Sequence, residues 1–488
     1  MSSLTPDSII RDALVYDGSL AAPVKQDVLI KGDKILTLTQ PGQHQARHVI
    51  DAGGLALAPG FIDVHTHDDL EVIRNPGMLN KISQGVTTVI VGNCGISAAP
   101  VHLNNAIPDP LNLLGEAEEF RFPRFKDYIQ AVNKAQPNVN VAALVGHTAL
   151  RAQVMDNLDR SASDQELAAM QALLSGALQE GALGLSTGLA YHSAHAASPD
   201  EVEALASVLK PYQGIYTTHL RSEFDGILGA LDEAFTLGRK QAVKVIISHL
   251  KCAGKANWGR APEVLSYLRQ AQTRQAIGCD CYPYSASSST LDLKQVTGDF
   301  DIDITWSEPY PAMAGKTLKQ IARIWQMPLQ QAARQLQPAG AVYHGMHEED
   351  VRHFLGFAGS MVGSDGLPCD PSPHPRLWGS FPRVLGHYVR DTGLLSLPLA
   401  IHKMTALSAS EFCLPRRGYI RPGYQADLVL FSPDEVADKA TFSEPQQRSA
   451  GIHGVWVNGQ LTYQAQKKDF VLSGTGAGQF ISGNVTNR

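Results

Sequence analysis

The chain has 488 residues, of which 44% are hydrophobic and 18% charged, and its formal net charge is -6 at pH 7. This composition is that of an ordinary globular protein and not of a disordered chain. The negative charge argues against nucleic-acid binding. No apolar run reaches the length of a membrane span, and residues 1–17 lack the basic start and apolar centre of a secretory signal. We therefore expect a cytoplasmic protein without a nucleic-acid or membrane partner.

Both ends of the chain alternate between apolar and polar residues in the manner of β-strands. The alternating segments are 8–18, 26–38, 48–57, 426–432 and 454–463. They predict one small β-sandwich domain built from both termini, residues 1–60 and 415–488. The Gly/Ser/Asn-rich tail after Ser473 is expected to be loosely ordered.

Between the two ends, short apolar runs alternate with helical patterns, which indicates a parallel sheet. Strands are predicted over residues 58–65, 86–91, 139–146, 182–186, 214–219, 243–249, 276–282 and 360–363. Helices are predicted over residues 164–179, 199–209, 227–239 and 262–274. Eight such units predict an α/β fold, a (β/α)8 TIM barrel over residues 61–414.

The stretch 285–346, between the seventh and eighth predicted strands, is too long for an ordinary barrel loop. We expect a lid-like insertion there. Its large aromatic residues, Trp306, Tyr310 and Trp325, are expected to form mostly the small core of the insertion rather than a wall of the substrate pocket.

Residues that bind metals follow several of the predicted strands. His65 and His67 project to one face of a strand, because side chains alternate along it. Cys94 follows the second strand, His147 the third and Tyr191 the fourth; further along come His219, His249 and Asp365. Taken singly, a buried histidine or cysteine is more often structural. Four of these histidines (His65, His67, His219 and His249) with one cysteine and one aspartate lie at equivalent strand ends, where barrel enzymes place their chemistry, and predict a metal centre.

Six segments in chain order are similar to motifs of the amidohydrolase superfamily: FIDVHTHDD, VGNCG, GLSTGLAY, TTHLRSE, VIISHLK and MVGSDG. Within that superfamily they resemble the N-acyl-D-amino-acid deacylases, also called D-aminoacylases. The resemblance extends from the N-terminal strands to the segment PGYQADLVLF. It implies zinc-dependent hydrolysis of N-acyl-D-amino acids to a carboxylate and a free D-amino acid.

The resemblance also implies a ligand set. Most binuclear members carry a bridging carboxylated lysine at the end of strand four, but residues 181–188 of this chain contain no lysine. The deacylase subgroup instead has a cysteine after strand two, where Cys94 stands. Cys94, His219 and His249 would then hold one zinc tightly, and His65, His67 and Asp365 would surround a second, weaker position. Three protein ligands leave zinc a place for a water whose pKa falls to around 7.

Other residues receive roles from the same resemblance. Asp365 would be the general base that passes a proton to the departing amine, and Tyr191 would help to polarise the carbonyl. Arg376 would bind the substrate α-carboxylate, with Tyr282 or Ser288 as neighbours. Apart from the resemblance, Lys251 or Lys294 could pair with a second carboxylate on the substrate side chain if either lysine reaches the pocket, which favours N-acyl-D-glutamate or N-acyl-D-aspartate.

Two alternatives are a cyclic-amide hydrolase of the hydantoinase or dihydropyrimidinase kind and a catalytically inactive barrel protein. The absent strand-four lysine and Cys94 argue against the first. The intact ligand set with Asp365 argues against the second. The choice of D over L substrates comes from the resemblance alone.

Overall fold

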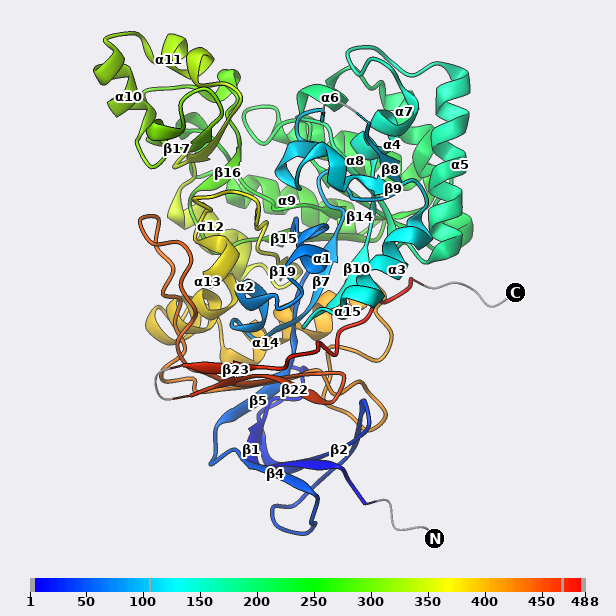
Figure 1. Ribbon diagram of the computed structural model, residues 1–488, viewed down its shortest axis with the longest axis vertical. Coiled ribbons are helices and arrows are strands. Elements are labelled where there is room, and N and C mark those ends of the chain that lie inside the picture. The colour runs from blue at the N-terminus through cyan, green and yellow to red at the C-terminus, as the bar shows by residue number, and fades with distance from the viewer. Residues whose placement is uncertain (1–4, 105–106, 467–468, 484–488) are drawn as a thin grey trace.

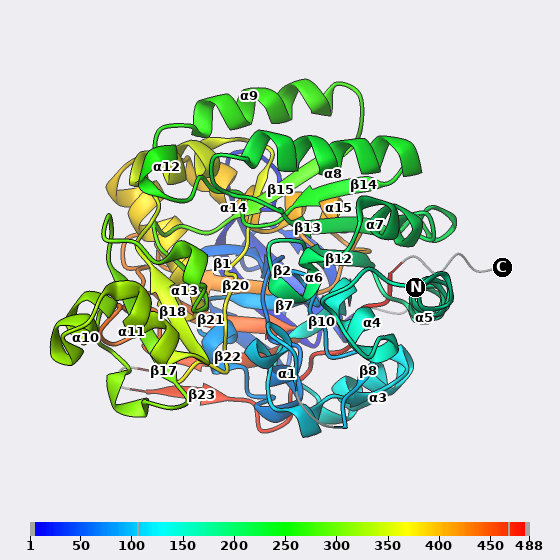
Figure 2. The ribbon, with the colours of Figure 1, turned by 90° about the horizontal axis from the view of Figure 1, so that it is seen from above.

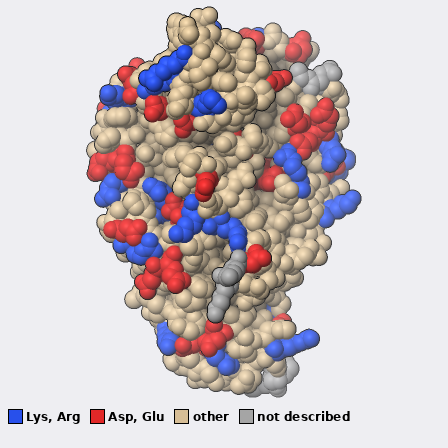
Figure 3. All heavy atoms as spheres, turned by 60° about the vertical axis from the view of Figure 1, so that its left-hand side comes forward, with Lys and Arg blue, Asp and Glu red and all other residues tan. Residues whose placement is uncertain are grey.

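The computed structural model describes residues 5–104, 107–466 and 469–483. A sheet made by the chain termini lies at the bottom of Figure 1, an α/β body lies above it, and a small insertion projects at the upper left. Acidic and basic side chains are interspersed over the face shown in Figure 3. No helix in the described ranges is long and apolar enough to cross a membrane.

Both ends of the chain contribute to one sheet, which has nine strands among the described residues. Its strands are β1 (Ser8–Val15), β2 (Val24–Lys31), β3 (Lys34–Thr39), β4 (His48–Asp51), β5 (Ala56–Pro59), β20 (Leu428–Phe431), β21 (Ile452–Val457), β22 (Gln460–Ala465) and β23 (Phe470–Leu472). The antiparallel pair β5–β20 joins the N-terminal strands to the C-terminal ones. Apolar side chains from both ends, among them Ile10, Leu57, Leu428 and Trp456, share one core.

The C-terminal tail, expected to be loosely ordered, is instead bound to the α/β body through residue 483. The Val141 amide donates to the Gln479 carbonyl at 3.0 Å, and the Ile481 amide donates to the Val141 carbonyl at 2.7 Å. A Cβ on Gly478 would lie 2.0 Å from the Val139 carbonyl oxygen. The glycines of this segment therefore allow close backbone approach rather than flexibility. Residues 484–488 lie outside the described part of the chain.

All eight predicted parallel strands have counterparts in the structure, and one of them, 139–146, corresponds to two short strands, β10 and β11. They form two runs of neighbours, β6–β7–β10 and β11–β12–β13–β14–β15–β19. Their bounds are β6 (Phe61–Asp63), β7 (Val86–Val91), β10 (Asn140–Ala143), β11 (Val145–Gly146), β12 (Gly184–Gly188), β13 (Ile215–His219), β14 (Lys244–Ile247), β15 (Ile277–Cys281) and β19 (Ser360–Val362). Just beyond the first and last of these strands, the Asp365 amide donates to the His65 carbonyl at 2.7 Å.

Two predicted strands are each divided in the structure. Residues 58–65 do not form one strand, because the chain passes at Gly60 from β5 in the terminal sheet to β6 in the parallel set. A Cβ on Gly60 would lie 2.2 Å from the Thr87 side chain, so the crossing requires glycine. The predicted strand 139–146 is interrupted at Leu144, whose amide donates to the Val91 carbonyl at 2.9 Å.

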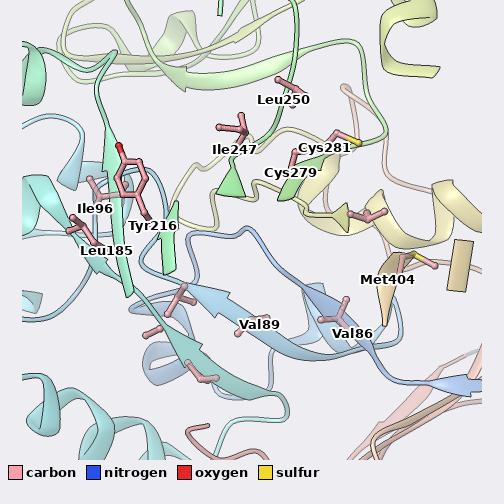
Figure 4. Close-up of a cluster of buried hydrophobic side chains, with 14 of the residues drawn as sticks. Val86, Val89, Ile96, Leu185, Tyr216, Ile247, Leu250, Cys279, Cys281 and Met404 are labelled. Carbon is pink, nitrogen blue, oxygen red and sulfur yellow. The ribbon is translucent and has the colours of Figure 1, made fainter. Parts of the chain in front are cut away.

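Alternate residues of the parallel strands enter two different cores. Val89 and Val91 belong to a cluster that also contains apolar residues of the helices, such as Leu174 and Leu231, and Val89 is labelled in Figure 4. Ile90, between them, packs in a second cluster that is covered by Phe412 and Leu414 from the chain after α15. Since the strands are parallel, their carboxyl ends all lie at one edge of the sheet, and polar residues can gather at that edge.

The segments between these strands are mostly helical, and Figure 2 shows α7, α8 and α9 lying outside β12 to β15. Ser163 caps α5 in a capping box with Glu166. The helices are α1 (Glu71–Arg74), α2 (Leu79–Ile82), α3 (Phe125–Ala135), α4 (His147–Val154), α5 (Asp164–Glu180), α6 (His192–His195), α7 (Pro199–Ala206), α8 (Ile227–Gln241), α9 (Ala261–Gln272), α12 (Glu348–Gly356), α13 (Arg376–Arg383), α14 (Leu397–Met404) and α15 (Ala406–Glu411). A two-stranded ribbon, β8 (Val101–His102) with β9 (Arg121–Phe122), completes this part.

The insertion has its own secondary structure and core. Its antiparallel strands are β16 (Ser287–Thr290), β17 (Ile302–Ser307) and β18 (Ala339–Tyr343), and its helices are α10 (Leu318–Trp325) and α11 (Leu329–Leu336). The rings of Tyr310 and Trp325 lie 4.9 Å apart and pack against this core, as expected. The indole of Trp306 lies against the backbone at Gly340.

A fully buried lysine connects the first and last parallel strands. The Lys81 ammonium on α2 donates to Asp63 at 2.8 Å, to Thr66 at 2.9 Å and to Ser364 at 2.8 Å. Asp63 also accepts from the Ser364 amide at 2.8 Å. This buried charge is therefore paired and hydrogen-bonded, and it fixes the two segments that carry His65 and Asp365.

We expect Lys81→Met to lower the free energy of unfolding by ~3–5 kcal/mol, because the substitution leaves the Asp63 carboxylate buried without its cation. Urea denaturation measures the change. The exposed Lys134 of α3 provides the control, and Lys134→Met should change stability by less than about 0.5 kcal/mol. A similar small effect for both variants would contradict the structural role of Lys81.

Candidate metal centre and active site

The structure brings together the six residues that the sequence predicts as metal ligands. The Cys94 sulfur lies 3.1 Å from His65 Nε2 and 3.3 Å from His249 Nε2. Asp365 Oδ1 lies 3.2 Å from His67 Nε2 and 3.5 Å from His65 Nε2. The His219 ring packs edge-on against the His249 ring, with centroids 4.4 Å apart. Donor atoms of the kinds that zinc prefers therefore converge at the carboxyl ends of the parallel strands.

Three of these residues have an unusual backbone conformation. Cys94, His249 and Asp365 have positive φ values of 54°, 35° and 50°. Non-glycine residues adopt such conformations rarely, and they cluster at functional sites. In each case the chain turns sharply just after its strand, so the side chain stays at the strand end.

The VGNCG motif shows why the chain can turn at Cys94. A Cβ on Gly92 would lie 2.2 Å from the Leu144 carbonyl oxygen, and one on Gly95 would lie 2.6 Å from the Gly188 amide. Both glycines have positive φ. The buried Asp69 accepts hydrogen bonds from the Gly92 and Ala98 amides and holds the loop from outside. The two glycines of the motif are therefore needed because other backbone segments pack closely around the cysteine.

Two buried carboxylates beside the histidines were not predicted from the sequence. Glu223 Oε1 lies 2.9 Å from His249 Nδ1, and Asp280 Oδ2 lies 3.4 Å from His65 Nδ1. Asp280 also accepts from the His249 amide at 2.9 Å. The available signals were an acidic residue four positions after His219 and an aspartate inside the otherwise apolar strand β15. Neither signal identifies the imidazole that the carboxylate faces.

The electrostatics of the cluster favour a thiolate. Burial by itself disfavours the thiolate and would raise the pKa of Cys94. The charges of His65 and His249 outweigh this effect and hold the pKa of Cys94 well below its usual value. Burial likewise opposes the imidazolium forms, yet Cys94 and neighbouring carboxylates raise the pKa of His65 and His67, and raise that of His249 to about 9. The cluster is therefore rich in anionic groups.

Four of the predicted substrate-binding residues lie beside the cluster. An Arg376 guanidinium nitrogen lies 2.8 Å from Asp365 Oδ2, and a second donates to the Ser288 carbonyl at 3.1 Å. The Tyr282 ring lies beneath both Arg376 and Lys251, whose ammonium contacts Glu223 at 2.6 Å. Lys251 is only 5% exposed, and its ammonium is already paired with Glu223 inside the protein.

Of the other residues singled out in the sequence, Tyr191 lies at the histidine cluster, whereas Lys294 and His147 lie away from it. The Tyr191 ring packs on His219, with centroids 4.9 Å apart. Lys294 is exposed on a short helical turn of the insertion, Leu293–Gln295, and its amide bonds to Asp292. His147 Nε2 lies 2.9 Å from Glu201 of α7, in a separate buried cluster with Arg151.

Comparison with known proteins identifies the family. The model of the amidohydrolase family matches residues 48–259 and 360–463, and the chain belongs to that family. Three curated relatives come from Alcaligenes xylosoxydans xylosoxydans. A D-aminoacylase is 45% identical, covering 98% of this chain and 97% of its own. An N-acyl-D-aspartate deacylase is 47% identical, with 94% and 93% covered, and an N-acyl-D-glutamate deacylase is 43% identical, with 93% of each covered.

Solved structures agree with these relatives. A D-aminoacylase crystal structure superposes with a TM-score of 0.95 at 46% identity, covering 98% of this chain and 99% of that one. The N-acyl-D-glutamate deacylase of Bordetella bronchiseptica, solved with zinc and a phosphonate mimic of the tetrahedral intermediate, superposes with a TM-score of 0.93 at 42% identity, covering 98% and 100%. An L-hydantoinase from Arthrobacter aurescens is 17% identical with a TM-score of 0.59, over 98% and 100%, which shows a shared fold only.

The lowered pKa of Cys94 predicts a thiolate at neutral pH in metal-free protein, because the thiol ionises above its pKa and regains its proton only on acidification. The ultraviolet absorbance of the thiolate should therefore decrease in Cys94→Ser at neutral pH. Burial raises the pKa of Cys252 to about 12, so Cys252→Ser should leave the absorbance unchanged. Equal absorbance in both variants and the parent would contradict the assignment.

Proposed function

We propose that the protein is a zinc-dependent hydrolase that cleaves the amide bond of N-acyl-D-amino acids, giving a carboxylate and a free D-amino acid. The observation that carries the proposal is the Cys94 sulfur between His65 and His249 at the ends of parallel strands. It occurs in a chain 43–47% identical, over nearly its whole length, to proteins named for deacylation of D-amino acids.

The proposal includes the architecture around that centre. Residues 61–414 form a barrel in which the eight parallel strand positions close on themselves, and hydrogen bonds between residues just after β6 and β19 support that closure. Residues 1–60 and 415–488 form the β-sandwich domain. The insertion at 285–346 covers the open end of the barrel as a lid.

The chemistry of the donor set fits a metal. Cys94 and the neighbouring carboxylates raise the pKa of His65, His67 and His249 against the effect of burial, so the cluster is rich in anionic groups and suits a bound cation. Cys94, His219 and His249 would hold the tight zinc, and His65, His67 and Asp365, together with Cys94, would hold a second ion. When bound, zinc acts as a Lewis acid on the amide carbonyl and acidifies a water.

The side chains around the metal position divide the remaining work. Arg376 holds the pKa of Asp365 well below its usual value although burial opposes this, so Asp365 is ionised and can accept a proton from the attacking water. The same carboxyl then protonates the departing nitrogen. Burial raises the pKa of Tyr191 far above its usual value, so its hydroxyl keeps its proton and can donate to the carbonyl oxygen. Arg376, above Tyr282, binds the substrate α-carboxylate.

A preference for acidic D-amino acids remains a prediction. Lys251 is paired with Glu223, and Lys294 is on the exposed side of the insertion. The relatives named for N-acyl-D-aspartate and N-acyl-D-glutamate support the preference, whereas the one named D-aminoacylase is similar to the same degree.

The cyclic-amide alternative has less support. Strand β12 contains no lysine to bridge two metals, and the similarity to the L-hydantoinase is one of fold. An inactive barrel protein would require loss of a ligand or of Asp365, whereas all six residues lie together at the centre.

The proposed function is tested by measuring amine release by zinc-loaded protein from N-acetyl-D-glutamate, N-acetyl-D-methionine and their L enantiomers. Ring opening of dihydrouracil is measured alongside. We expect turnover of the D compounds alone, and the ratio of glutamate to methionine turnover reports the side-chain preference. Turnover of dihydrouracil, or of the L compounds only, would disprove the proposal.

A pair of substitutions separates the proton carrier from the metal ligands. Asp365→Asn should retain the tight zinc, measured by metal analysis, while kcat falls by about 10²- to 10⁴-fold because the base is lost. Cys94→Ala should lose zinc, whereas Cys413→Ala, at an exposed cysteine, should keep it. Full zinc content in Cys94→Ala would remove Cys94 from the ligand set.

A further inference from the structure

Glu223 occupies a position between two metal-ligand candidates and a buried lysine. It follows β13 by four residues and is 7% exposed. Its Oε1 lies 2.9 Å from His249 Nδ1 and 2.6 Å from the Lys251 ammonium, and its Oε2 lies 3.6 Å from His219 Nε2. The carboxylate therefore contacts the side of His249 that faces away from Cys94.

The two neighbours of His249 Nδ1 require opposite hydrogen-bonding roles of this nitrogen: one requires an acceptor and the other a donor. The Lys251 ammonium, at 2.8 Å, can only donate a hydrogen bond, whereas the Glu223 carboxylate can only accept one. If Nδ1 accepts from Lys251, the neutral ring carries its proton on Nε2, the nitrogen that faces Cys94. If Nδ1 donates to Glu223, Nε2 is left with its lone pair available.

We propose that Glu223 is a positioning residue that keeps the proton of His249 on Nδ1 and draws the Lys251 ammonium to itself, so that His249 Nε2 is available to bind zinc. The inference rests on the proposed function, in which His249 holds the tight metal. Carboxylates commonly orient metal-binding histidines in this way, and their loss typically lowers metal affinity by about 10–100-fold. The distinctive feature here is the competing lysine.

The competition gives the inference a specific consequence: Lys251 harms zinc binding only when Glu223 is absent. With Glu223 present, the ammonium has an anion at 2.6 Å and need not donate to the ring. Without the carboxylate, Nδ1 becomes an acceptor that the buried ammonium can reach. Removing the lysine as well should therefore restore the ring to its metal-binding form.

The test compares the zinc affinity of four full-length proteins: the parent, Glu223→Gln, Lys251→Met and the double variant. Zinc dissociation constants are measured by competition with a chromophoric chelator. Glu223→Gln should bind zinc about 10–100-fold more weakly, and Lys251→Met should bind it like the parent. The double variant should recover most of the lost affinity, giving a large coupling between the two sites.

Glu233→Gln is the matched control. Glu233 forms an ion pair with Arg221 at 2.8 Å and does not touch the histidine cluster through any described contact, so its loss should leave zinc affinity unchanged. A double variant as weak as Glu223→Gln, or a Glu223→Gln protein that binds zinc like the parent, would overturn the inference. If Glu223→Gln does not fold, the comparison of Lys251→Met with the double variant decides, since the double variant is expected to bind zinc nearly as tightly as Lys251→Met, and a double variant about 10–100-fold weaker would overturn the inference. A parent protein that binds no zinc would disprove the proposed function itself.

Discussion

The negative charge on Cys94 is surrounded by imidazole rings that come from separate parallel strands. His65 and His249 lie within 3.3 Å of the sulfur, and their charges hold the pKa of the thiol down against the effect of burial. A thiolate is stable in a buried place only with such compensation. The strand ends must therefore meet closely, and the glycines around Cys94 and the left-handed backbones at His249 and Asp365 follow from this requirement.

Carboxylates brace this arrangement from one strand to the next. Asp63, at the end of β6, accepts from the Ser364 amide and from Lys81. Asp280 on β15 accepts from the His249 amide and also lies near the His65 ring. Each acid ties two strand ends together, so the positions of the imidazoles are fixed by backbone contacts as well as by packing. This is the rigidity that a preorganised site needs.

Much of the fold and of the ligand set could be predicted because both depend on local periodicity. Apolar runs of strand length identified all eight parallel strand positions. Ligand-type residues directly after those runs include the six that meet, but also His147, which lies instead beside Glu201; the motif resemblance is what separates the six from His147. The crossing of the chain at Gly60 from one sheet to the other, and the role of the tail glycines, depend on contacts with residues far away in the sequence. The local hydrophobic pattern contains no information on such contacts. Glu223, Asp280 and Lys81 were missed for a related reason. A charged residue looks the same in a sequence whether it faces solvent or a buried partner.

The pairing of β5 with β20 also determines at which stage of synthesis the terminal sheet can form. Strands β1 to β5 are made first, but their neighbour β20 begins at Leu428, and the tail that lies along Val141 comes later still. Closing so long a stretch of chain costs entropy before any of these contacts form. The β20 side of β5 therefore stays unpaired while the ribosome makes the α/β body, and the contacts of residues 478–483 with that body form later still.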